Sequence, residues 1–283
     1  MRKQHHQRVA DYYDATAWEY RLVLNLEAHH GLHFGYYDTA HKTYPEASLN
    51  MNRVLADRAR VGRGMRVLDA GCGIGGSSVW LAKHRECFCV GITLSAKQCA
   101  RAQSFARDSG VSDKAAFLVQ DYTQTHFPNA SFDVVWAVES VCHAPQKITF
   151  LKEAYRLLRP GGTLIIADGF RAKRRYSPSE EQLMRTWLDG WVVPDIDHHD
   201  DFVKKMTKVG FFHIHYQNAT PHVLPFSRWV ARRAALLTPI AQILRVLGIF
   251  TELQVNNGIA ATAQYEALTH GLWEYGVTVG KKA

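Results

Sequence analysis

The stretch Arg66-Val-Leu-Asp-Ala-Gly-Cys-Gly-Ile-Gly-Gly76 decides the fold of this chain. The apolar run over residues 65–68 predicts a short buried strand, which ends in the carboxylate of Asp69. Glycines follow at positions 71, 73, 75 and 76, and a helical pattern covers residues 77–85. A strand, a glycine-rich turn and a helix in this order open a βαβ unit. The glycines allow a sharp turn and a close approach of the backbone to a ligand.

Three of these glycines also satisfy the dinucleotide fingerprint G-x-G-x-x-G, which is weak evidence alone. An NAD site also needs an acid about 20 residues further on, at the end of the second strand. The second predicted strand, 87–92, runs into Ile92-Thr-Leu-Ser95, which contains no acid. The acid precedes the glycines instead, at Asp69. The sequence therefore argues against an NAD site.

Apolar and helical patterns alternate through the middle of the chain. They predict strands over 65–69, 87–92, 116–120, 132–138 and 163–167, and helices over 46–61, 75–85, 95–109 and 146–158. This alternation predicts an α/β fold, a Rossmann-like doubly wound sheet. Ligands bind such sheets beyond the carboxyl ends of the strands. We therefore expect one cleft to be lined by the polar side chains at or near strand ends, which are Asp69, Thr93, Asp121, Glu139 and Asp168.

Helical segments flank this core on both sides. Residues 1–50 are expected to form an aromatic-rich N-terminal cap, and residues 222–270 a helical, apolar lid over the substrate end of the cleft. Residues 51–221 form the predicted core, with an insertion over 176–200. Residues 271–283 are expected to add the closing edge strand of the sheet.

The composition is that of an ordinary globular enzyme, with 47% hydrophobic and 21% charged residues and a net charge of +8. None of the five cysteines forms a C-x-x-C pair, which argues against a disulfide framework or a zinc site and favours the cytoplasm. The longest apolar run, 234–250, is interrupted by Pro239, Gln242 and Arg245 and is too short to span a bilayer. We do not expect peripheral membrane contact, and a homo-oligomer stays open.

Several motifs resemble those of the class I methyltransferases that depend on S-adenosylmethionine (SAM). Val67-Leu-Asp-Ala-Gly-Cys-Gly73 resembles their first motif, and Gln120-Asp-Tyr122 resembles their adenine-contact motif. Leu157-Leu-Arg-Pro-Gly-Gly162 resembles the turn before their fifth strand. Gly91-Ile-Thr-Leu-Ser95, with Gln98, resembles the second-strand end of tocopherol and cyclopropane-fatty-acid methyltransferases. These matches cover residues 60–168 in the family's order, although the acid that most members carry after the second strand is missing.

A narrower resemblance concerns the substrate. Glu139-Ser-Val-Cys-His-Ala-Pro145 is similar to the fourth-strand motif of sterol C-24 methyltransferases. Tyr12-Tyr-Asp14 and His33-Phe-Gly-Tyr36 resemble the leader of that group and of the tocopherol methyltransferases. Bacterial terpenoid methyltransferases, including those that act on prenyl diphosphates, share the pattern. The resemblance implies SAM-dependent C-methylation of an alkene carbon in an isoprenoid or terpenoid acceptor, through a carbocation that loses a proton or cyclises.

The resemblance also implies roles for individual residues. The cofactor candidates are Asp69, Gly71, Gly73 and Gly75 for the methionine portion, Thr93 and Gln98 for the ribose, and Asp121 and Tyr122 for the adenine. An alkene acceptor also requires a base that removes a proton. Glu139 is the first candidate, His143 lies beside it, and Asp168 is the third.

A carbocation is stabilised by aromatic faces. The substrate-binding candidates are Tyr12, Tyr20, Phe34, Tyr36 and Trp187, together with Arg171 and Arg174 for a diphosphate. Mg²⁺ is expected only if the substrate is a diphosphate. No metal site of the protein itself is expected, because His198-His-Asp-Asp201 lacks ligand spacing.

Other classes of function stay open at this point. N-, O- or ring C-methylation of an alkaloid or a phenolic, tocopherol-like natural product is the main alternative. A regulatory protein that binds SAM without turnover is a second. Nucleic acid is not an expected partner, because the catalytic motifs of the amino-methylating DNA enzymes are absent after the fourth predicted strand.

Overall fold

The computed structural model of the protein describes residues 2–24 and 31–283. Its centre is a seven-stranded sheet with the order β3-β2-β1-β4-β5-β7-β6. The strands are β1 Arg66–Ala70, β2 Phe88–Thr93, β3 Ala115–Val119, β4 Phe132–Val138, β5 Leu158–Arg171, β6 Phe211–Asn218 and β7 Trp273–Lys282. The first five are parallel, and β7 runs antiparallel to both β5 and β6. The predicted α/β fold is confirmed, and strand order reverses between β1 and β4, where such sheets bind ligands.

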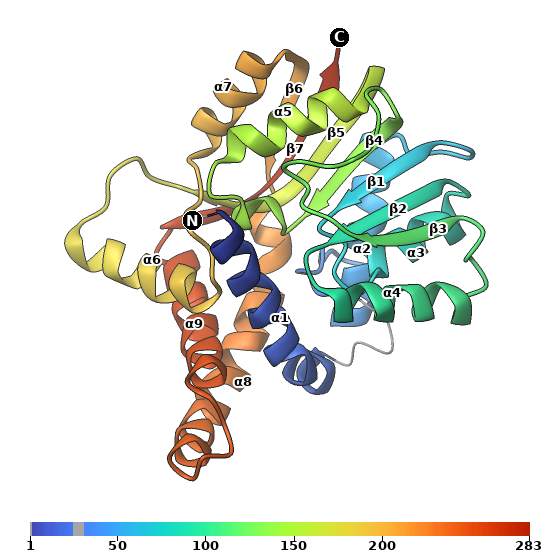
Figure 1. Ribbon diagram of the computed structural model, residues 1–283. Helices are drawn as coiled ribbons and strands as arrows, with labels where there is room; N and C mark the ends of the chain where they lie inside the picture. Colours follow the sequence, from blue (N-terminus) through green and yellow to red (C-terminus); the bar gives the residue numbers. More distant parts are fainter. Residues whose placement is uncertain (1, 25–30) are drawn as a thin grey trace.

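Helices cover both faces of this sheet (Figure 1). They are α1 Arg2–Leu24, α2 Tyr44–Ala59, α3 Gly76–His84, α4 Ala96–Asp108, the 3₁₀ helix η2 Val141–His143, α5 Lys147–Leu157, α6 Pro178–Gly190, α7 His199–Val209, α8 Thr220–Val246 and α9 Glu252–Thr269. The core helices predicted from the sequence begin and end within two residues of the observed ones. One reason is local chemistry, since the side chain of Ser95 caps α4 by accepting a hydrogen bond from the backbone N–H of Gln98.

Two hydrophobic layers follow from the alternation of side chains along each strand. Val67, Val134, Trp136 and Ile165 face a layer that includes α2, α3, α6, α8 and α9. Leu68, Val135, Ala137, Leu164 and Ile166 face the opposite layer, with α5 and α7. Because both faces are covered, the central strands are apolar almost throughout, as their sequence indicates.

The last strand corrects one expectation. The sequence predicts that residues 271–283 close the sheet as an edge strand, but β7 lies between β5 and β6 and pairs with both. The edge is β6, whose alternating pattern leaves one face solvated. β5 is also longer than expected, because Arg159-Pro-Gly-Gly162 lies within the strand. The long pairing of β5 with β7 brings Gly169 opposite Tyr275, near the carboxyl end of β4.

Two helical elements lie outside the sheet layers. α1 runs alongside the carboxyl ends of the strands, and α8 and α9 form a hairpin that projects away from the sheet (Figure 1). Among the described residues, no helix is both long enough and apolar enough to cross a membrane. The inner surface of the projecting hairpin contributes to the site described next.

Candidate active site

The glycine-rich turn after β1 forms the floor of the first of two pockets. Gly71 has a φ of 96°, and a Cβ on it would lie 2.4 Å from the Cβ of Ser140, which follows β4. Only glycine fits this crossing, since it tolerates positive φ and leaves room for the neighbouring loop. The pocket lies at the point where strand order reverses between β1 and β4.

Most of the predicted cofactor residues line this pocket, namely Asp69, Gly71, Gly73, Thr93, Gln98 and Tyr122. Gly75 does not, and its positive φ serves packing, because a Cβ there would meet Ala102 and Phe117 at 2.9 Å. Asp121 does not line it either. Its carboxylate accepts hydrogen bonds from the backbone N–H and the hydroxyl of Thr123, and it lies 3.6 Å from His6 of α1.

Asp69 lies beneath the glycine turn. Its carboxylate accepts a hydrogen bond of 2.6 Å from the hydroxyl of Ser78 on α3, and burial raises its pKa to about 6. A buried carboxylate that retains a lone pair toward a pocket suits a cationic ammonium group, whose charge would offset the cost of burial. This fits the α-amino group of a bound SAM.

The region beyond β2 carries no acid of its own, but α1 supplies one. Thr93 and Gln98 are joined by a hydrogen bond of 2.7 Å. The hydroxyl of Ser95 donates to the carboxylate of Asp14, and the ammonium of Lys97 lies 3.7 Å from the same carboxylate. Residues Val9, Ala10 and Tyr13 of the same helix line the cofactor pocket. The N-terminal helix thus covers the pocket, with Asp14 fixing it to the start of α4.

Glu139 lies at the junction of the two pockets and lines both. It follows β4 directly and has a left-handed backbone with a φ of 50°, which is strained for a residue with a side chain. Its Oε1 atom accepts hydrogen bonds from the hydroxyl of Tyr275 at 2.7 Å and from the backbone N–H of Phe34 at 2.8 Å. Burial, the largest cause, and the neighbouring Asp168 raise the pKa of Glu139 to about 8.

His143 lies on the same loop and also lines both pockets. Its Nδ1 atom lies 3.2 Å from the carbonyl oxygen of Val192, which can only accept, so Nδ1 carries the proton. Its Nε2 atom then accepts a hydrogen bond of 3.0 Å from the hydroxyl of Tyr13. Burial lowers the pKa of His143 to about 4, so the ring is neutral at pH 7 and Nε2 presents a lone pair.

Asp168 lines the second pocket, but its oxygens are used to hold the loop after β4. One oxygen accepts from the backbone N–H of Cys142 at 2.9 Å and the other from the N–H of Gly169 at 2.8 Å. The buried ammonium of Lys147 supports the same loop by donating to the carbonyl oxygens of Cys142, Ala144 and Asp195. The structure therefore gives Asp168 a positioning role.

The second pocket is a cavity of about 410 Å³ between α1, α6, α8, α9 and the sheet. Four predicted substrate residues line it, Tyr12, Tyr20, Phe34 and Trp187. Tyr36 does not, because it stacks on His222 with ring centroids 3.9 Å apart. The sequence analysis missed further aromatic walls, which are Tyr13, Trp191, Phe226, Phe250, Trp273 and Tyr275. The leader motif Tyr12-Tyr-Asp14 could have indicated Tyr13. The other aromatic residues lie in the insertion, the lid and β7.

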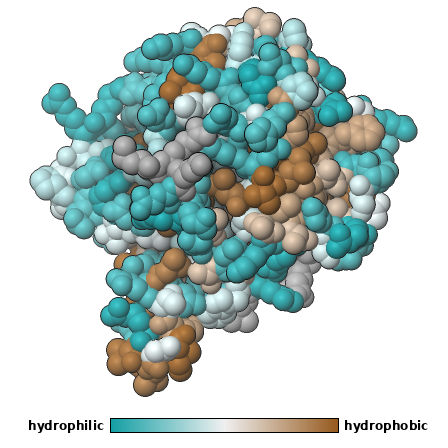
Figure 2. Space-filling view, viewed as in Figure 1, coloured by the Kyte–Doolittle hydropathy of each residue, from teal (hydrophilic) through white to brown (hydrophobic). Residues whose placement is uncertain are grey.

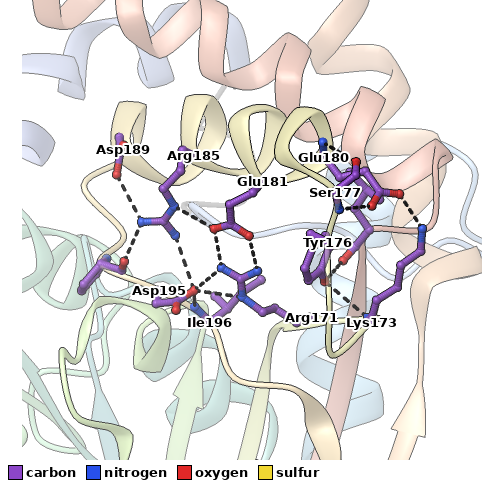
Figure 3. A network of polar contacts seen from close by, with 12 residues as sticks. Arg171, Lys173, Tyr176, Ser177, Glu180, Glu181, Arg185, Asp189, Asp195 and Ile196 are labelled. Atoms are coloured by element: carbon purple, nitrogen blue, oxygen red, sulfur yellow. Dashed lines mark hydrogen bonds and ion pairs between the residues drawn. The ribbon is translucent and has the colours of Figure 1, made fainter.

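The two predicted arginines lie outside this pocket. Arg171 forms two hydrogen bonds of 2.8 and 3.0 Å with the carboxylate of Glu181 and a third contact of 2.9 Å with Asp195 (Figure 3). These carboxylates raise the pKa of Arg171 above its usual range. Arg174 is bound in the same way by Asp200 and Asp201. Both guanidinium groups are already neutralised, so the structure does not present them to a diphosphate.

A cluster of polar side chains also lines the second pocket, which we call the acceptor pocket. Asn257 of α9 donates a hydrogen bond of 2.8 Å to the carboxylate of Glu19 and accepts one of 2.8 Å from the hydroxyl of Tyr12. Tyr20 in turn donates to the Tyr12 hydroxyl at 2.8 Å. All four residues line the pocket. Glu19 and Asn257 therefore offer a carboxylate and an amide to a polar group on an otherwise apolar acceptor.

His198, His199 and Asp200 place potential metal-ligand atoms within 4.8 Å of one another. Each side chain already has a partner, however. His199 lies 2.7 Å from the carboxylate of Glu274, Asp200 is bound by Arg174, and Nδ1 of His198 accepts the N–H that caps α7. A guanidinium in this position opposes a second cation, and the residues fit no metal.

The comparisons with known proteins agree with this geometry. Residues 68–166 match the family model for a methyltransferase domain. The chain is 30% identical over 249 residues to a probable tocopherol O-methyltransferase of Oryza sativa subsp. japonica, covering 84% of this chain and 68% of that protein. It is equally 30% identical to the tocopherol O-methyltransferase of Arabidopsis thaliana, covering 72% of it and 84% of this chain.

Solved structures share the fold. The cyclopropane synthase MmaA2 of Mycobacterium tuberculosis superposes with a TM-score of 0.80 at 18% identity, over 98% of each chain. The matched family model and the two relatives show the family, and the solved structure shares the fold. The chain therefore belongs to the class I SAM-dependent methyltransferases, in the group that contains the tocopherol O-methyltransferases.

Proposed function

We propose that this methyltransferase methylates an alkene carbon of an isoprenoid acceptor, and that Glu139 takes up the proton that the acceptor then loses. The observation that carries the proposal is the position of the Glu139 carboxylate, which lines both the cofactor pocket and the aromatic acceptor pocket. The two pockets also share Tyr13, Leu32, His33 and His143. A methyl group that passes from one pocket to the other would therefore pass among these residues, beside Glu139.

When bound, SAM supplies a methyl group activated by the positive sulfonium. Transfer of this methyl to an alkene forms one carbon–carbon bond, consumes the π bond and leaves a positive charge on the neighbouring acceptor carbon. Aromatic faces stabilise such a charge, and Phe34, Trp187 and Trp273 provide them in the pocket. Loss of a proton to a carboxylate then restores a double bond and leaves Glu139 protonated.

The hydrogen bonds of Glu139 suit this role. Tyr275 and Phe34 both donate to Oε1. Within residues 2–24 and 31–283, no hydrogen bond occupies Oε2, so this oxygen is open to the pocket. A pKa of about 8 makes the carboxylate a stronger base than an exposed glutamate and still leaves part of the population ionised near neutral pH.

The electrostatics of the pocket favour an uncharged acceptor over a prenyl diphosphate. Glu19, Glu139 and Asp168 contribute carboxylates to its lining, whereas Arg171 and Arg174 lie elsewhere and are paired. Arg233 also lines the pocket, but it is an exposed side chain that lies 3.9 Å over the ring of Trp229. A hydroxyl group at the end of the acceptor could donate to Glu19 and accept from Asn257.

A second candidate is methylation of a phenolic acceptor. The observation in its favour is the lone pair of His143 Nε2, which a phenol hydroxyl could reach by replacing Tyr13. Proton removal from the phenol would activate either its oxygen or a ring carbon. The tocopherol O-methyltransferase names of the two relatives make this candidate worth a direct test.

The test is turnover with methyl-labelled SAM against a prenyl alcohol, the matching prenyl diphosphate, a sterol, a prenylated indole and a tocopherol-type phenol. We expect the largest kcat/KM with an uncharged isoprenoid. Glu139→Gln should lower kcat by about 10²-fold or more and leave the Kd for SAM within about twofold, because a general base acts in the chemical step. His143→Gln should be the more damaging change if the phenol is the acceptor. Full turnover by Glu139→Gln would refute the role of the carboxylate.

A further inference from the structure

The projecting end of the α8–α9 hairpin exposes an unusual amount of aliphatic surface. We name residues 236–250, which include the end of α8 and its connection to α9, the hairpin tip. Seven aliphatic side chains in it are at least half exposed, with exposed fractions of 75% for Leu236, 50% for Leu237, 53% for Ile240, 62% for Ile243, 83% for Val246, 65% for Leu247 and 64% for Ile249. Figure 2 shows them as a continuous apolar end below the polar body of the molecule. Apolar patches of this kind mark interaction sites.

The same tip forms part of the acceptor pocket. Leu237 and Ile240 line the pocket although about half of each side chain is exposed, and Leu244 and Phe250 line it as well. The apolar interior of the pocket is thus continuous with the apolar outer surface of the tip. An acceptor that enters between α8 and α9 passes over aliphatic side chains all the way from the surface.

The charges around the tip are mostly positive, the exception being Glu252 at the start of α9. α8 contains Arg228, Arg232, Arg233 and Arg245 and no acidic residue. Arg245 lies within the tip, and Arg232 and Arg233 lie just before it, all in a chain with a net charge of +8. Trp18 of α1 is 44% exposed and packs edge-on against Phe250, with ring centroids 5.4 Å apart. Aliphatic residues at an end, an exposed tryptophan beside them and arginines around them form the pattern of a segment that inserts into a membrane interface.

We infer that the hairpin tip docks into the interfacial layer of an anionic lipid bilayer and that the acceptor enters the pocket directly from the lipid. The tip is too short to cross the bilayer, so it would insert its aliphatic side chains among the lipid chains while the arginines face the anionic headgroups. This differs from the expectation from the sequence, which disfavoured membrane contact. The inference rests on the exposed surface and its charge and does not require a particular acceptor.

The experiment is co-sedimentation of the whole protein with phosphatidylcholine vesicles, prepared with and without phosphatidylglycerol. We expect binding that increases with phosphatidylglycerol and weakens as salt is raised. The double variant Val246→Asp with Leu247→Asp should lower vesicle affinity by more than about tenfold, because two aliphatic side chains that insert into the lipid are replaced by carboxylates. The matched control is Phe88→Asp with Phe212→Asp, on β2 and β6, whose side chains are 48% and 41% exposed away from the tip, and it should bind vesicles as the wild type does.

Binding of S-adenosylhomocysteine by each variant shows that it is folded, since none of the substituted residues lines the cofactor pocket. Absence of vesicle binding by the wild type, or equal binding by the wild type and the tip variant, would overturn the inference. Light scattering after gel filtration tests whether a second copy of this chain covers the tip instead. A wild-type dimer that the tip variant converts to a monomer, without vesicle binding, would assign the tip to a second copy of this chain. None of these readouts depends on the proposed reaction, so a failure of the membrane inference can be distinguished from a failure of the proposed function.

Discussion

At the scale of the residue, Glu139 combines three features that each cost free energy. Its side chain is a carboxylate in an apolar cavity, its backbone has a positive φ, and a second carboxylate, Asp168, lies close enough to raise its pKa. Strain of this kind persists where the surrounding structure holds it and concentrates at functional sites. Here the hydrogen bonds from Tyr275 and Phe34 provide the support.

The pKa of Glu139 predicts a pH dependence. A base works in its ionised form, and the ionised fraction of a group with a pKa of about 8 rises as the pH rises through 8, so turnover should increase over this range. The hydrogen bond from Tyr275 favours the ionised form, so Tyr275→Phe should move the rise in the pH–rate profile to higher pH. Tyr265→Phe, a change on the surface side of α9, is the control. An unchanged profile in Tyr275→Phe would show that another group titrates.

The residues of the site differ in how far the sequence predicted them. Glu139 and Asp168 follow strands that the apolar pattern marks clearly, so parallel pairing alone brings them to one edge. Tyr275 is 136 residues from Glu139 and reaches it only because β7 pairs with β5 in one register. Nothing local in the sequence encodes that register. The partners of Arg171 were missed for a related reason, since Glu181 comes from the first turn of α6 and Asp195 from the loop after that helix.

At the scale of the element, α1 connects the two pockets. Val9 and Ala10 line the cofactor side, Tyr12 and Tyr20 line the acceptor side, and Tyr13 lines both. The carboxylate of Asp14 binds this helix to the N-terminus of α4, through Ser95 and Lys97. A negative charge at a helix N-terminus is favourable. α1 therefore acts as a cover whose position depends on a small number of polar contacts.

Asp14→Asn tests this cover. Loss of the charge should weaken SAM binding several-fold, mainly through faster dissociation, because a hydrogen bond to a charged group is worth about 1.5–3 kcal/mol before solvent screening. The measurement is stopped-flow dissociation of S-adenosylhomocysteine. Asp11→Asn is the matched control, since Asp11 lies one turn earlier on α1 and its carboxylate accepts an exposed hydrogen bond of 2.8 Å from Gln7 of the same helix. Equal dissociation rates in both variants would contradict the role of Asp14.

The elements of the core were predictable because each carries its own local signal. The apolar run 132–138 gives β4 without change, and Ser95 marks the start of α4. The position of β7 between β5 and β6 was not predictable, since an apolar strand pattern does not say which neighbours it will have. The α8–α9 hairpin was expected as a lid, but its projection from the body depends on tertiary packing.

At the scale of the whole molecule, the basic segment after β5 serves stability. Arg171 is 16% exposed in its side chain and joins β5, α6 and the loop at Asp195 (Figure 3). Arg171→Ala should lower the free energy of unfolding by about 1–2 kcal/mol after solvent screening, because Glu181 and Asp195 lose a shared partner. Thermal unfolding measures this. Arg174→Ala removes a side chain that is 49% exposed and should lower the free energy of unfolding by less than Arg171→Ala does. A change of preferred acceptor in Arg171→Ala, without loss of stability, would contradict this assignment.

In the whole molecule, the cofactor pocket and the acceptor pocket meet at the carboxylate of Glu139. The cofactor pocket lies against the glycine turn and beneath α1, whereas the acceptor pocket is lined by α1, α6, α8 and α9. This separation lets a polar cofactor and a lipid-like acceptor enter from different surroundings. The central claim is that the methyl group is joined to carbon in the aromatic pocket beside Glu139.

The measurement that tests this claim most directly is ¹³C NMR of the product formed from ¹³C-methyl SAM and the preferred acceptor, with the wild type and Glu139→Gln. We predict a methyl group bonded to carbon, the loss of one proton from the acceptor, and about 10²-fold slower formation of this product by Glu139→Gln. A methyl group bonded to oxygen or nitrogen, or an unchanged rate of carbon methylation by Glu139→Gln, would contradict the account.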